Sequence, residues 1–425
     1  MKLNKFSSAG GSVFVGMLFV CLAASAAFAA SNETVLHSFR PAQMDTAPGL
    51  VVDARGNLYG SAGFGGVGCG TATDGCGVIF KLIAQGGQWH YQVLYSFQGG
   101  SDGSGPNAVM LDAAGNIYGT TYWGGDLSCG TAFKLAPNSD GTWTFGTIHE
   151  FKGSPNGCHP VGRFVLDSAG NLYGVTGNGG ILFGTVFQLT PSAAGWQETV
   201  LYTFQSGRDY YDGAYPSTGL TLDAAGNLYG TTIEGGNNND CFGGCGVVFG
   251  LIYASGIWTE TVLHRFNYFT EGAMPLSTLA LDAAGNIYGT NFLGGTGAVG
   301  GGTAFRLAPN GSGGWTFTLL HTFNDNSLTS DGCFPSGDLV LDSQGNLYGT
   351  TGGGGAFQNG EVYELIANSG TGPWAEQRVY SFAGGVDGSA PVAGVIRDTL
   401  GNFFGTTEIG GAFGSGTAFE VKPIQ

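Results

Sequence analysis

The chain has 425 residues, of which 10% are charged and 13% aromatic, and it contains 81 glycines. So little charge and so many aromatic side chains exclude an intrinsically disordered chain and a flexible linker. The formal net charge of −16 disfavours nucleic acid as a partner, because an acidic surface repels phosphate groups.

Residues 1–29 have the pattern of a signal peptide. Two lysines near the start precede an apolar run from Val13 to Ala27, and Ala27-Phe28-Ala29 fits an A-x-A cleavage site. The run is short for a membrane-spanning helix and ends in small residues, and no second apolar segment is long enough to span a bilayer. We therefore expect a mature domain of residues 30–425 that is secreted, periplasmic or on the cell surface.

One motif recurs seven times after this segment, at intervals of 55 to 60 residues. It begins with Asp and continues with two variable residues, then Gly-Asn, an apolar pair and Gly. The motif copies start at Asp53, Asp112, Asp167, Asp223, Asp282, Asp342 and Asp398. A fixed period of this length indicates a propeller or a solenoid.

Each period contains four strand-like segments, and the fourth repeat illustrates them. Segments 219–222, 228–232, 247–251 and 258–266 are apolar or β-branched and are separated by Gly-rich turns and loops. Between the first two, Asp223 opens a tight turn in which Gly226 supplies the positive φ. No capped apolar helix follows the signal segment, so we predict an all-β, seven-bladed propeller of four-stranded antiparallel blades.

The two ends of the chain complement each other. The last repeat contains only three strands, whereas residues 33–39 (ETVLHSF) form a lone copy of a fourth strand, like residues 198–204 (ETVLYTF). An N-terminal strand that completes the last blade would close the ring and protect the sheet edges. A β-solenoid is the alternative, although its coils are usually shorter and need no complementary ends.

Together these residues resemble a known family. A VLYSF strand, a D-G-x-x-P loop, LDxxGNLYGTT, a Gly-Gly loop and GTxFxL are similar to the bacterial GloVer-type tandem repeat, some members of which carry a C-terminal sorting anchor. The resemblance covers almost the whole mature chain and implies an extracytoplasmic bacterial protein. The DxxGNLY turn is also similar to NHL and gluconolactonase-like propellers, but that similarity brings no catalytic residue to this chain.

An acidic or amide residue followed by Pro precedes each first strand. The pairs are Asp45/Pro48, Asp102/Pro106, Asn156/Pro160, Asp212/Pro216, Glu271/Pro275, Asp331/Pro335 and Asp387/Pro391. A ring of carboxylates could bind Ca²⁺. Turn chemistry that satisfies backbone donors explains the same pattern and is favoured, because function usually breaks the symmetry of a repeat. We expect no cofactor, with Ca²⁺ as the alternative.

Most histidines also follow the repeat. Four of them, His37, His149, His264 and His321, share one position of the fourth strand with Tyr95, Tyr202 and Tyr380. The chain has no H-x-x-x-H or H-E-x-x-H spacing and no G-x-S-x-G elbow, so the sequence predicts neither a zinc site nor a serine nucleophile.

Three polar residues break the repeat and are candidate binding residues. His159 stands in a loop, and Arg163 and Asp338 precede the turn Asp where other repeats have small residues such as Gly219. One hypothesis is that they line a shallow polar pocket near the mouth of the central channel; the alternative, which the pattern favours, is that they are solvated residues at loop ends. Because Arg163 and Asp338 stand three blades apart, the sequence does not predict an ion pair between them.

Seven cysteines remain after signal removal, and an oxidising compartment favours disulfides. Cys69 with Cys76, and Cys241 with Cys245, lie within single loops, whereas Cys129 and Cys158 lie in neighbouring loops of the same face. We predict these three pairs and assign no partner to Cys333.

Two functions remain open. The first is a monomeric, non-catalytic binding or scaffold module that contacts a glycan or a surface protein through loop aromatics, namely Tyr122, Trp123, Tyr210, Tyr211, Tyr268 and Phe269. The second is a lyase or lactonase-type enzyme with a metal at the channel mouth. We could not assemble the required acidic or histidine cluster there from the sequence, which favours the binding module.

Overall fold

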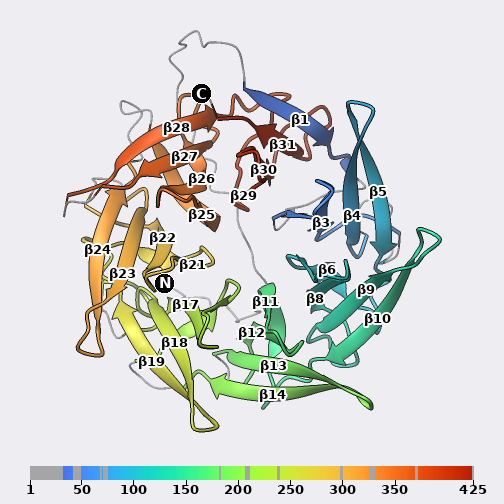
Figure 1. Ribbon diagram of the computed structural model, residues 1–425, viewed down its shortest axis with the longest axis horizontal. Helices are drawn as coiled ribbons and strands as arrows, with labels where there is room; N and C mark the ends of the chain where they lie inside the picture. The colour runs from blue at the N-terminus through green and yellow to red at the C-terminus, as the bar shows by residue number, and fades with distance from the viewer. Residues whose placement is uncertain are drawn as a thin grey trace, which may run out of the picture.

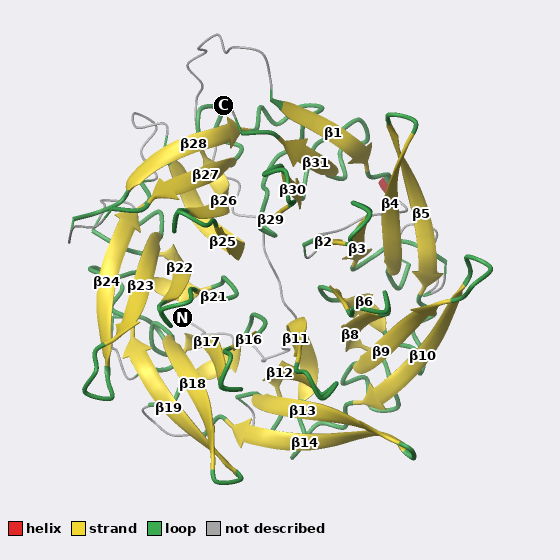
Figure 2. Cartoon of the chain, viewed as in Figure 1, coloured by secondary structure: helices red, strands yellow, loops and turns green. Residues whose placement is uncertain are grey.

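The computed structural model describes residues 32–41, 49–67, 69, 75–180, 183–205, 211–236, 240–296, 300–324, 331–368 and 372–423. Within these ranges the elements are β-strands joined by loops and turns (Figure 2). They form seven antiparallel sheets arranged as the blades of a ring (Figure 1). The chain is therefore a seven-bladed β-propeller, and the predicted fold class is confirmed. Signal residues 1–29 lie outside the described ranges.

The strands follow the same order in every blade, from the axis of the ring outward. Blade 1 contains β2 (Val51–Val52), β3 (Leu58–Ala62), β4 (Val78–Gln85) and β5 (Gln88–Ser96). Blade 2 contains β6 (Ser104–Pro106), β7 (Met110–Leu111), β8 (Ile117–Trp123), β9 (Thr131–Pro137) and β10 (Trp143–Glu150). Blade 3 contains β11 (Cys158–Leu166), β12 (Leu172–Asn178), β13 (Thr185–Ser192) and β14 (Gly195–Thr203).

The remaining blades repeat the pattern. Blade 4 contains β15 (Ala214–Pro216), β16 (Thr221–Leu222), β17 (Leu228–Glu234), β18 (Val247–Ala254) and β19 (Ile257–Arg265). Blade 5 contains β20 (Ala273–Pro275), β21 (Ala280–Leu281), β22 (Ile287–Leu293), β23 (Thr303–Pro309) and β24 (Trp315–Thr322). Blade 6 contains β25 (Gly332–Leu341), β26 (Leu347–Gly354), β27 (Glu361–Ile366) and β28 (Ala375–Ser381). Blade 7 contains β29 (Val395–Arg397), β30 (Phe403–Thr406), β31 (Thr417–Val421) and β1 (Glu33–Ser38).

The innermost strand differs from the sequence-based expectation. In blades 2, 4 and 5 it is split into two short pieces that pair with the same second strand, as β15 and β16 do with β17. In blades 3 and 6 it is continuous, although the register shifts within β11 and β25. The expected first strand at 219–222 is therefore reduced to β16, and β15 extends the pairing upstream.

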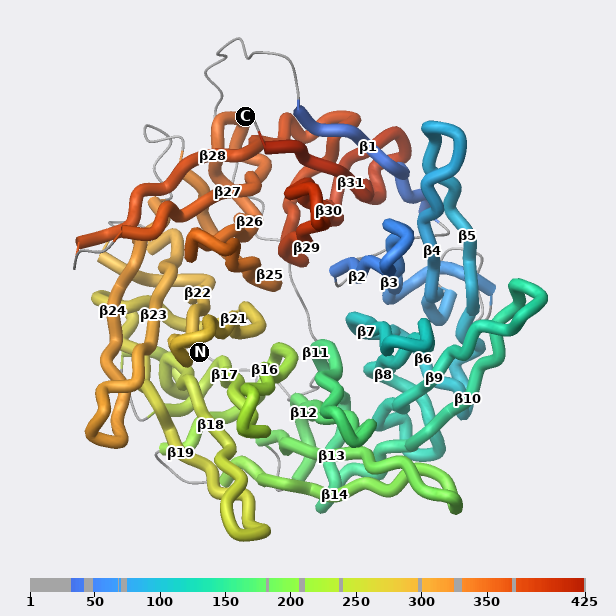
Figure 3. The backbone as a smooth tube through the Cα atoms, in the orientation of Figure 1, coloured from blue at the N-terminus to red at the C-terminus, as the bar shows by residue number. Residues whose placement is uncertain are grey.

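The N-terminal strand closes the ring. Strand β1 pairs antiparallel with β31, with Glu33 opposite Val421 and Ser38 opposite Thr417. Figure 3 shows the blue N-terminal strand lying along the red C-terminal one. This pairing confirms the predicted closure and excludes the β-solenoid, because both ends of the chain contribute to a single blade.

One aromatic contact recurs at every junction between blades. The Phe that ends each fourth strand meets the aromatic residue of the third strand in the next blade, with ring centroids 4.9 to 5.5 Å apart. The pairs are Phe39–Phe80, Phe97–Phe133, Phe151–Phe187, Phe204–Phe249, Phe266–Phe305, Phe323–Tyr363 and Phe382–Phe419. These side chains are buried and the two rings of each pair meet edge-on or tilted, so similar aromatic packing holds the whole ring together.

The repeated Asp of the hairpin is a turn residue, as predicted. Asp53 Oδ1 accepts hydrogen bonds from the backbone N–H groups of Arg55 and Asn57, and Asp53 Oδ2 accepts from Asn57 Nδ2 and the Tyr59 hydroxyl. The backbone and amide bonds of this network recur at the other six turns. Because both carboxylate oxygens are used within the turn, the motif stabilises the hairpin.

The described residues form no helix that is long and apolar enough to cross a membrane.

Candidate functional site

The acidic residues in the loops that join the blades are bonded to the preceding strand. Asp102 Oδ2 accepts hydrogen bonds from the Tyr95 hydroxyl at 2.9 Å and from the Gln98 backbone N–H at 2.8 Å. The equivalent pairs in other blades are Tyr202 with Asp212, His264 with Glu271, His321 with Asp331 and Tyr380 with Asp387. The acidic residues of these loops thus contact the Tyr or His residues of the fourth strands, which supports the interpretation of both sets as structural residues.

In each described loop that joins two blades, the residue immediately before the recurrent Pro has a left-handed backbone conformation. These residues have φ values between 54° and 64° and are Gly105, His159, Tyr215, Met274, Phe334 and Ala390. The backbone N–H of each donates to a carbonyl of the preceding blade at 2.7 to 3.1 Å. We call these six residues the left-handed ring. Side chains other than glycine are strained in this conformation, and such strain concentrates at functional sites.

The side chains of the left-handed ring vary although their backbone does not. Glycine would adopt this φ with least strain, yet only one of the six described positions is glycine. Each side chain is half-buried and the Pro that follows it is buried. The six described positions therefore share one backbone geometry, while each carries a different residue.

The end of the second strand supplies a second variable position on the same face. Near its end, the second strand of each blade has two residues that are mostly Thr-Thr, and the two residues after them differ between blades. These pairs are Gly63-Phe64, Tyr122-Trp123, Gly177-Asn178, Ile233-Glu234, Phe292-Leu293, Gly352-Gly353 and Glu408-Ile409. Phe292 contacts Phe334 of the next blade, with ring centroids 5.3 Å apart. The variable strand ends and the left-handed ring thus form one surface, which we call the loop face.

The junction of blades 2 and 3 brings three predicted binding residues together. The His159 imidazole stacks on the Tyr122 ring at 4.6 Å and meets the Trp123 ring edge-on at 4.5 Å. Asn178 Nδ2 lies 3.4 Å from His159 Nδ1. Burial lowers the pKa of His159, which keeps the imidazole neutral and suited to stacking at neutral pH. Trp123 remains 41% exposed, so the cluster presents an aromatic surface to solvent.

A disulfide fixes this aromatic cluster. Cys129 and Cys158 are bonded across the junction of blades 2 and 3, and Cys158 immediately precedes His159. The other two predicted pairs, Cys69–Cys76 and Cys241–Cys245, are also formed. All three predicted disulfides are therefore present, while Cys333 lies buried outside them.

A small pocket of about 260 Å³ lies at the junction of blades 4 and 5. It is lined by ten residues: Ile233, Glu234, Asp240, Cys241, Phe242, Gly244, Tyr268, Ala273, Met274 and Leu293. Met274 belongs to the left-handed ring, and Cys241 belongs to a disulfide. Tyr268, one of the aromatics that the sequence places near the loop face, lines the pocket, whereas the neighbouring Phe269 is 63% exposed.

Arg163 and Asp338 form an ion pair, which the sequence did not predict. The Arg163 guanidinium on β11 contacts the Asp338 carboxylate on β25, and each side chain is about one quarter exposed, at 26% and 25%. Burial lowers the pKa of Arg163. The expected pocket of His159, Arg163 and Asp338 is therefore resolved into two groups, the ion pair and the aromatic cluster around His159.

The structure places the other predicted residues as follows. Tyr211 is 55% exposed and its carbonyl accepts a hydrogen bond from Arg265, whereas Tyr210 lies outside the described residues. Sequence reasoning missed Tyr215 and Phe334. The signal that could have found them is the residue before each loop Pro, whose identity changes among these six repeats while the Pro after it and the Gly two positions before it do not.

Comparison with solved structures supports the fold alone. The extracellular domain of a candidate one-component system from B. thetaiotaomicron is 11% identical with a TM-score of 0.51, over 87% of this chain and 37% of that one. This chain thus spans little more than a third of that structure. A gluconolactonase from Xanthomonas campestris is 12% identical with a TM-score of 0.41, over 75% of this chain and 85% of its own.

A Thermus thermophilus protein described as an oxidoreductase (glucose dehydrogenase) candidate is 16% identical with a TM-score of 0.43, over 74% of this chain and 95% of its own. No curated protein matches the sequence. The model of the Gloeobacter/Verrucomicrobia repeat matches residues 3–243 and 242–425, which is almost the whole chain. With seven repeats that close into one ring, this chain belongs to the Gloeobacter/Verrucomicrobia repeat family.

Proposed function

We propose that this propeller is an extracytoplasmic, non-catalytic binding module that recognises a glycan through its loop face. The observation that carries the proposal is the aromatic cluster of Tyr122, Trp123 and His159, held at one junction by the Cys129–Cys158 disulfide. Aromatic faces beside polar groups bind the apolar faces and hydroxyl groups of sugars, and Asn178 supplies an amide at the edge of this cluster.

The location of the cluster also supports binding. It lies where two blades meet, and its members come from a strand end and from a strained backbone position that vary from blade to blade. Residues that serve only the fold follow the repeat, as the interblade Phe pairs do. Disulfides and the expected signal segment favour a location outside the cytoplasm.

The enzyme alternative receives less support from the arrangement of charges. A lyase or lactonase-type mechanism would use a cluster of acidic or histidine side chains close to the axis. The described group of three carboxylates belongs instead to blade 6 and the loop that leads into it, and two of its members lie on the outer strands β27 and β28. The inner strands β11 and β25 contribute the Arg163–Asp338 pair, whose charges neutralise each other.

A glycan array probed with the mature chain tests the proposal. Trp123→Ala should weaken binding to the recognised glycan about tenfold or more, equivalent to roughly 1.4 kcal/mol. Leu400→Ala, which removes a side chain that is 85% exposed at the opposite hairpin turn, should leave binding unchanged. Failure to bind any glycan, or equal binding by Trp123→Ala and the parent chain, would overturn the proposal. Capture of a protein partner that depends on Trp123 would likewise overturn the choice of a glycan.

A further inference from the structure

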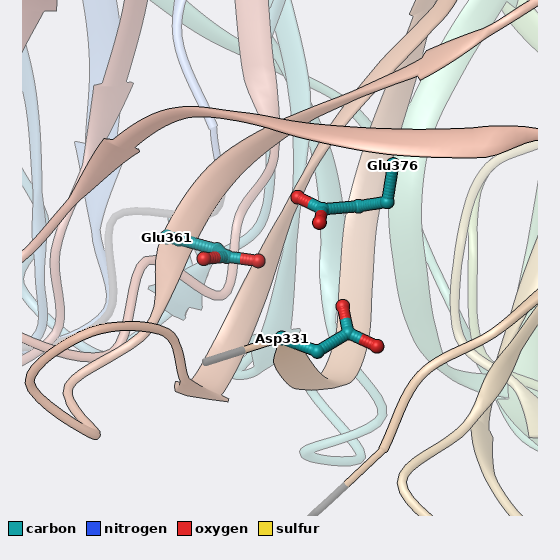
Figure 4. A group of neighbouring side chains, drawn as sticks. All are labelled: Asp331, Glu361 and Glu376. Carbon is teal, nitrogen blue, oxygen red and sulfur yellow. The ribbon is translucent and has the colours of Figure 1, made fainter. Parts of the chain in front are cut away.

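The junction of blades 5 and 6 contains a cluster of three acidic residues, of which Glu361 is buried and the other two are half-buried. Carboxylate oxygens of Asp331, Glu361 and Glu376 lie within 4.8 Å of one another. Figure 4 shows the three side chains converging from the loop before β25, from β27 and from β28. Two oxygens that bind the same cation at about 2.0 to 2.4 Å lie no more than about 4.8 Å apart.

Glu361 breaks the repeat at a fully buried position. Its side chain is 0% exposed, and the corresponding third-strand residues in blades 2, 3, 5 and 7 are Thr131, Thr185, Thr303 and Thr417. Those hydroxyls are satisfied, since Thr131 Oγ1 donates to the Asp102 carbonyl and Thr417 Oγ1 to the Asp387 carbonyl. In blade 6 a carboxylate replaces a satisfied hydroxyl, which costs stability unless a positive charge or a proton accompanies it.

Arg378 compensates only part of this charge. Its Nε donates to Glu361 Oε2 at 3.0 Å, while Glu361 Oε1 has no hydrogen-bond partner among the described residues. One buried oxygen of Asp331 and one of Glu376 are also without a hydrogen-bond partner there. Glu361 is fully buried and has an unpartnered oxygen, and each of the two carboxylates beside it also has an unpartnered buried oxygen. This is the second sign, besides the acidic cluster itself, of a bound cation.

An imidazole lies beside this cluster. His321 Nε2 on β24 lies 3.4 Å from Asp331 Oδ2 and makes no hydrogen bond among the described residues, but it lies outside the group of mutually close donor atoms. Three carboxylate oxygens are a suitable donor set for a divalent cation such as Zn²⁺ or Mn²⁺. A single proton could join two of the three carboxylate oxygens, but it would leave the third oxygen and the imidazole unsatisfied.

We propose that Asp331, Glu361 and Glu376 form a divalent transition-metal site that joins the loop before β25 to the outer strands of blade 6. The site is distinct from the loop-face cluster, and its occupancy does not depend on the proposed glycan ligand. The short sequence spacings that mark zinc sites could not reveal it, because its residues come from two strands and one loop. Burial and the charge of Glu376 raise the pKa of Glu361 to about 8, which a bound cation would reverse.

Metal content and thermal stability of the mature chain test the site. After treatment with EDTA, the chain is dialysed separately against Zn²⁺, Mn²⁺ and Ca²⁺, its metal content is measured by mass spectrometry, and its melting temperature is recorded. We expect one equivalent of Zn²⁺ or Mn²⁺ per chain and a higher melting temperature. Glu361→Gln should weaken binding by more than about tenfold, the loss that even an indirect substitution causes in metal sites.

Two further variants keep the test decisive. Glu361→Thr introduces the residue that four other blades carry, so this variant should fold and bind no metal. Glu260→Gln is the matched control, because Glu260 occupies the position of Glu376 two blades earlier, where Val247 stands in place of Glu361. This control should bind the metal as the parent chain does. Retention of Ca²⁺ alone, no retained metal, or equal binding by Glu361→Gln and the parent chain would overturn the proposal.

Discussion

Arg163 on β11 is paired with Asp338 on β25, three blades away around the ring. The two strands are the continuous innermost strands of blades 3 and 6, so the ion pair links opposite sides of the ring across its axis. Each inner strand also makes a close backbone approach to its neighbour, because Gly162 packs against the Gly219 backbone and Gly337 against that of Gly394. The ion pair therefore connects two junctions at which the inner strands already touch.

Removal of one partner of this pair should destabilise the propeller. Arg163→Met leaves the Asp338 carboxylate without its counter-charge. Because both side chains are three quarters buried, we expect the free energy of unfolding to fall by about 1–2 kcal/mol, less than for a fully buried pair. The double variant Arg163→Met with Asp338→Asn should recover part of the loss. Urea unfolding of the four proteins in a double-mutant cycle measures the coupling. A coupling of zero would show that the pair contributes nothing to stability.

Deletion of residues 33–39 should open the ring and lower the melting temperature by on the order of 10 °C or more. The deletion removes Leu36 and Phe39, which are buried at 6% and 4% exposure, and leaves the β31 edge without its partner. Differential scanning calorimetry of the truncated chain measures the effect. Thr34→Ser, at an exposed position of the same strand, is the control and should melt with the parent chain. An unchanged melting temperature after the deletion would contradict closure by β1.

The three disulfides should differ in their contribution to stability. Cys129–Cys158 closes a segment with a sequence separation of 29 and joins two blades, whereas Cys241–Cys245 has a separation of 4. Loop entropy predicts losses of about 3–4 and about 2 kcal/mol for the respective Cys→Ser pairs. Chemical denaturation measures both losses. The variant without Cys129–Cys158 should also lose glycan affinity, since Cys158 holds His159 in place, while the other variant retains it.

Thiol titration adds a check on the same pairing. In the mature, denatured and unreduced chain one thiol should react, because Cys333 lies outside the three disulfides. In the folded chain this thiol should react slowly, since Cys333 is only 2% exposed. Reaction of more than one thiol after denaturation would show that at least one disulfide does not form.

Stability should fall as the pH rises from about 5 to 8 in the presence of EDTA. Burial and a nearby carboxylate raise the pKa of Glu33 to about 7, of Glu260 to about 7 and of Glu361 to about 8, from an ordinary value of 4.5. Below pH 4.5 both the folded and unfolded chains hold these protons. Above it the unfolded chain releases them first, so the free energy of unfolding decreases until the folded groups also ionise.

We expect the free energy of unfolding to fall by on the order of 2 kcal/mol between pH 5 and 8, after allowance for partial exposure of two of the groups. Urea unfolding at both pH values measures it. Glu33→Gln removes one of the titrating groups and should reduce the pH dependence, whereas Asp126→Asn, at an exposed loop position, should leave it unchanged. A free energy of unfolding that rises with pH would contradict the raised pKa values.

The number of blades, their four-stranded composition, the closing strand and the three disulfides could all be predicted from the sequence. The blades and the closing strand depend on local patterns that repeat, namely an alternating apolar strand and a Gly turn with an acidic opening residue. The disulfides depend instead on cysteines that lie in one loop or in two neighbouring loops. Because each copy must pack against the next copy in the same way, a repeated pattern fixes a repeated contact. The interblade Phe pairs follow directly from this rule.

Only the tertiary structure decided which non-repeated residues meet. Arg163 and Asp338 are far apart in the chain and come together because the ring places blades 3 and 6 on opposite sides of its axis. His159 joins Tyr122 and Trp123 rather than Arg163, because its left-handed backbone is anchored to the preceding blade through its N–H. Likewise Asp331, Glu361 and Glu376 form a cluster because β27 pairs with β28 and the loop before β25 lies beside them. Such contacts depend on how strands and blades are placed in three dimensions, which the local sequence patterns do not encode.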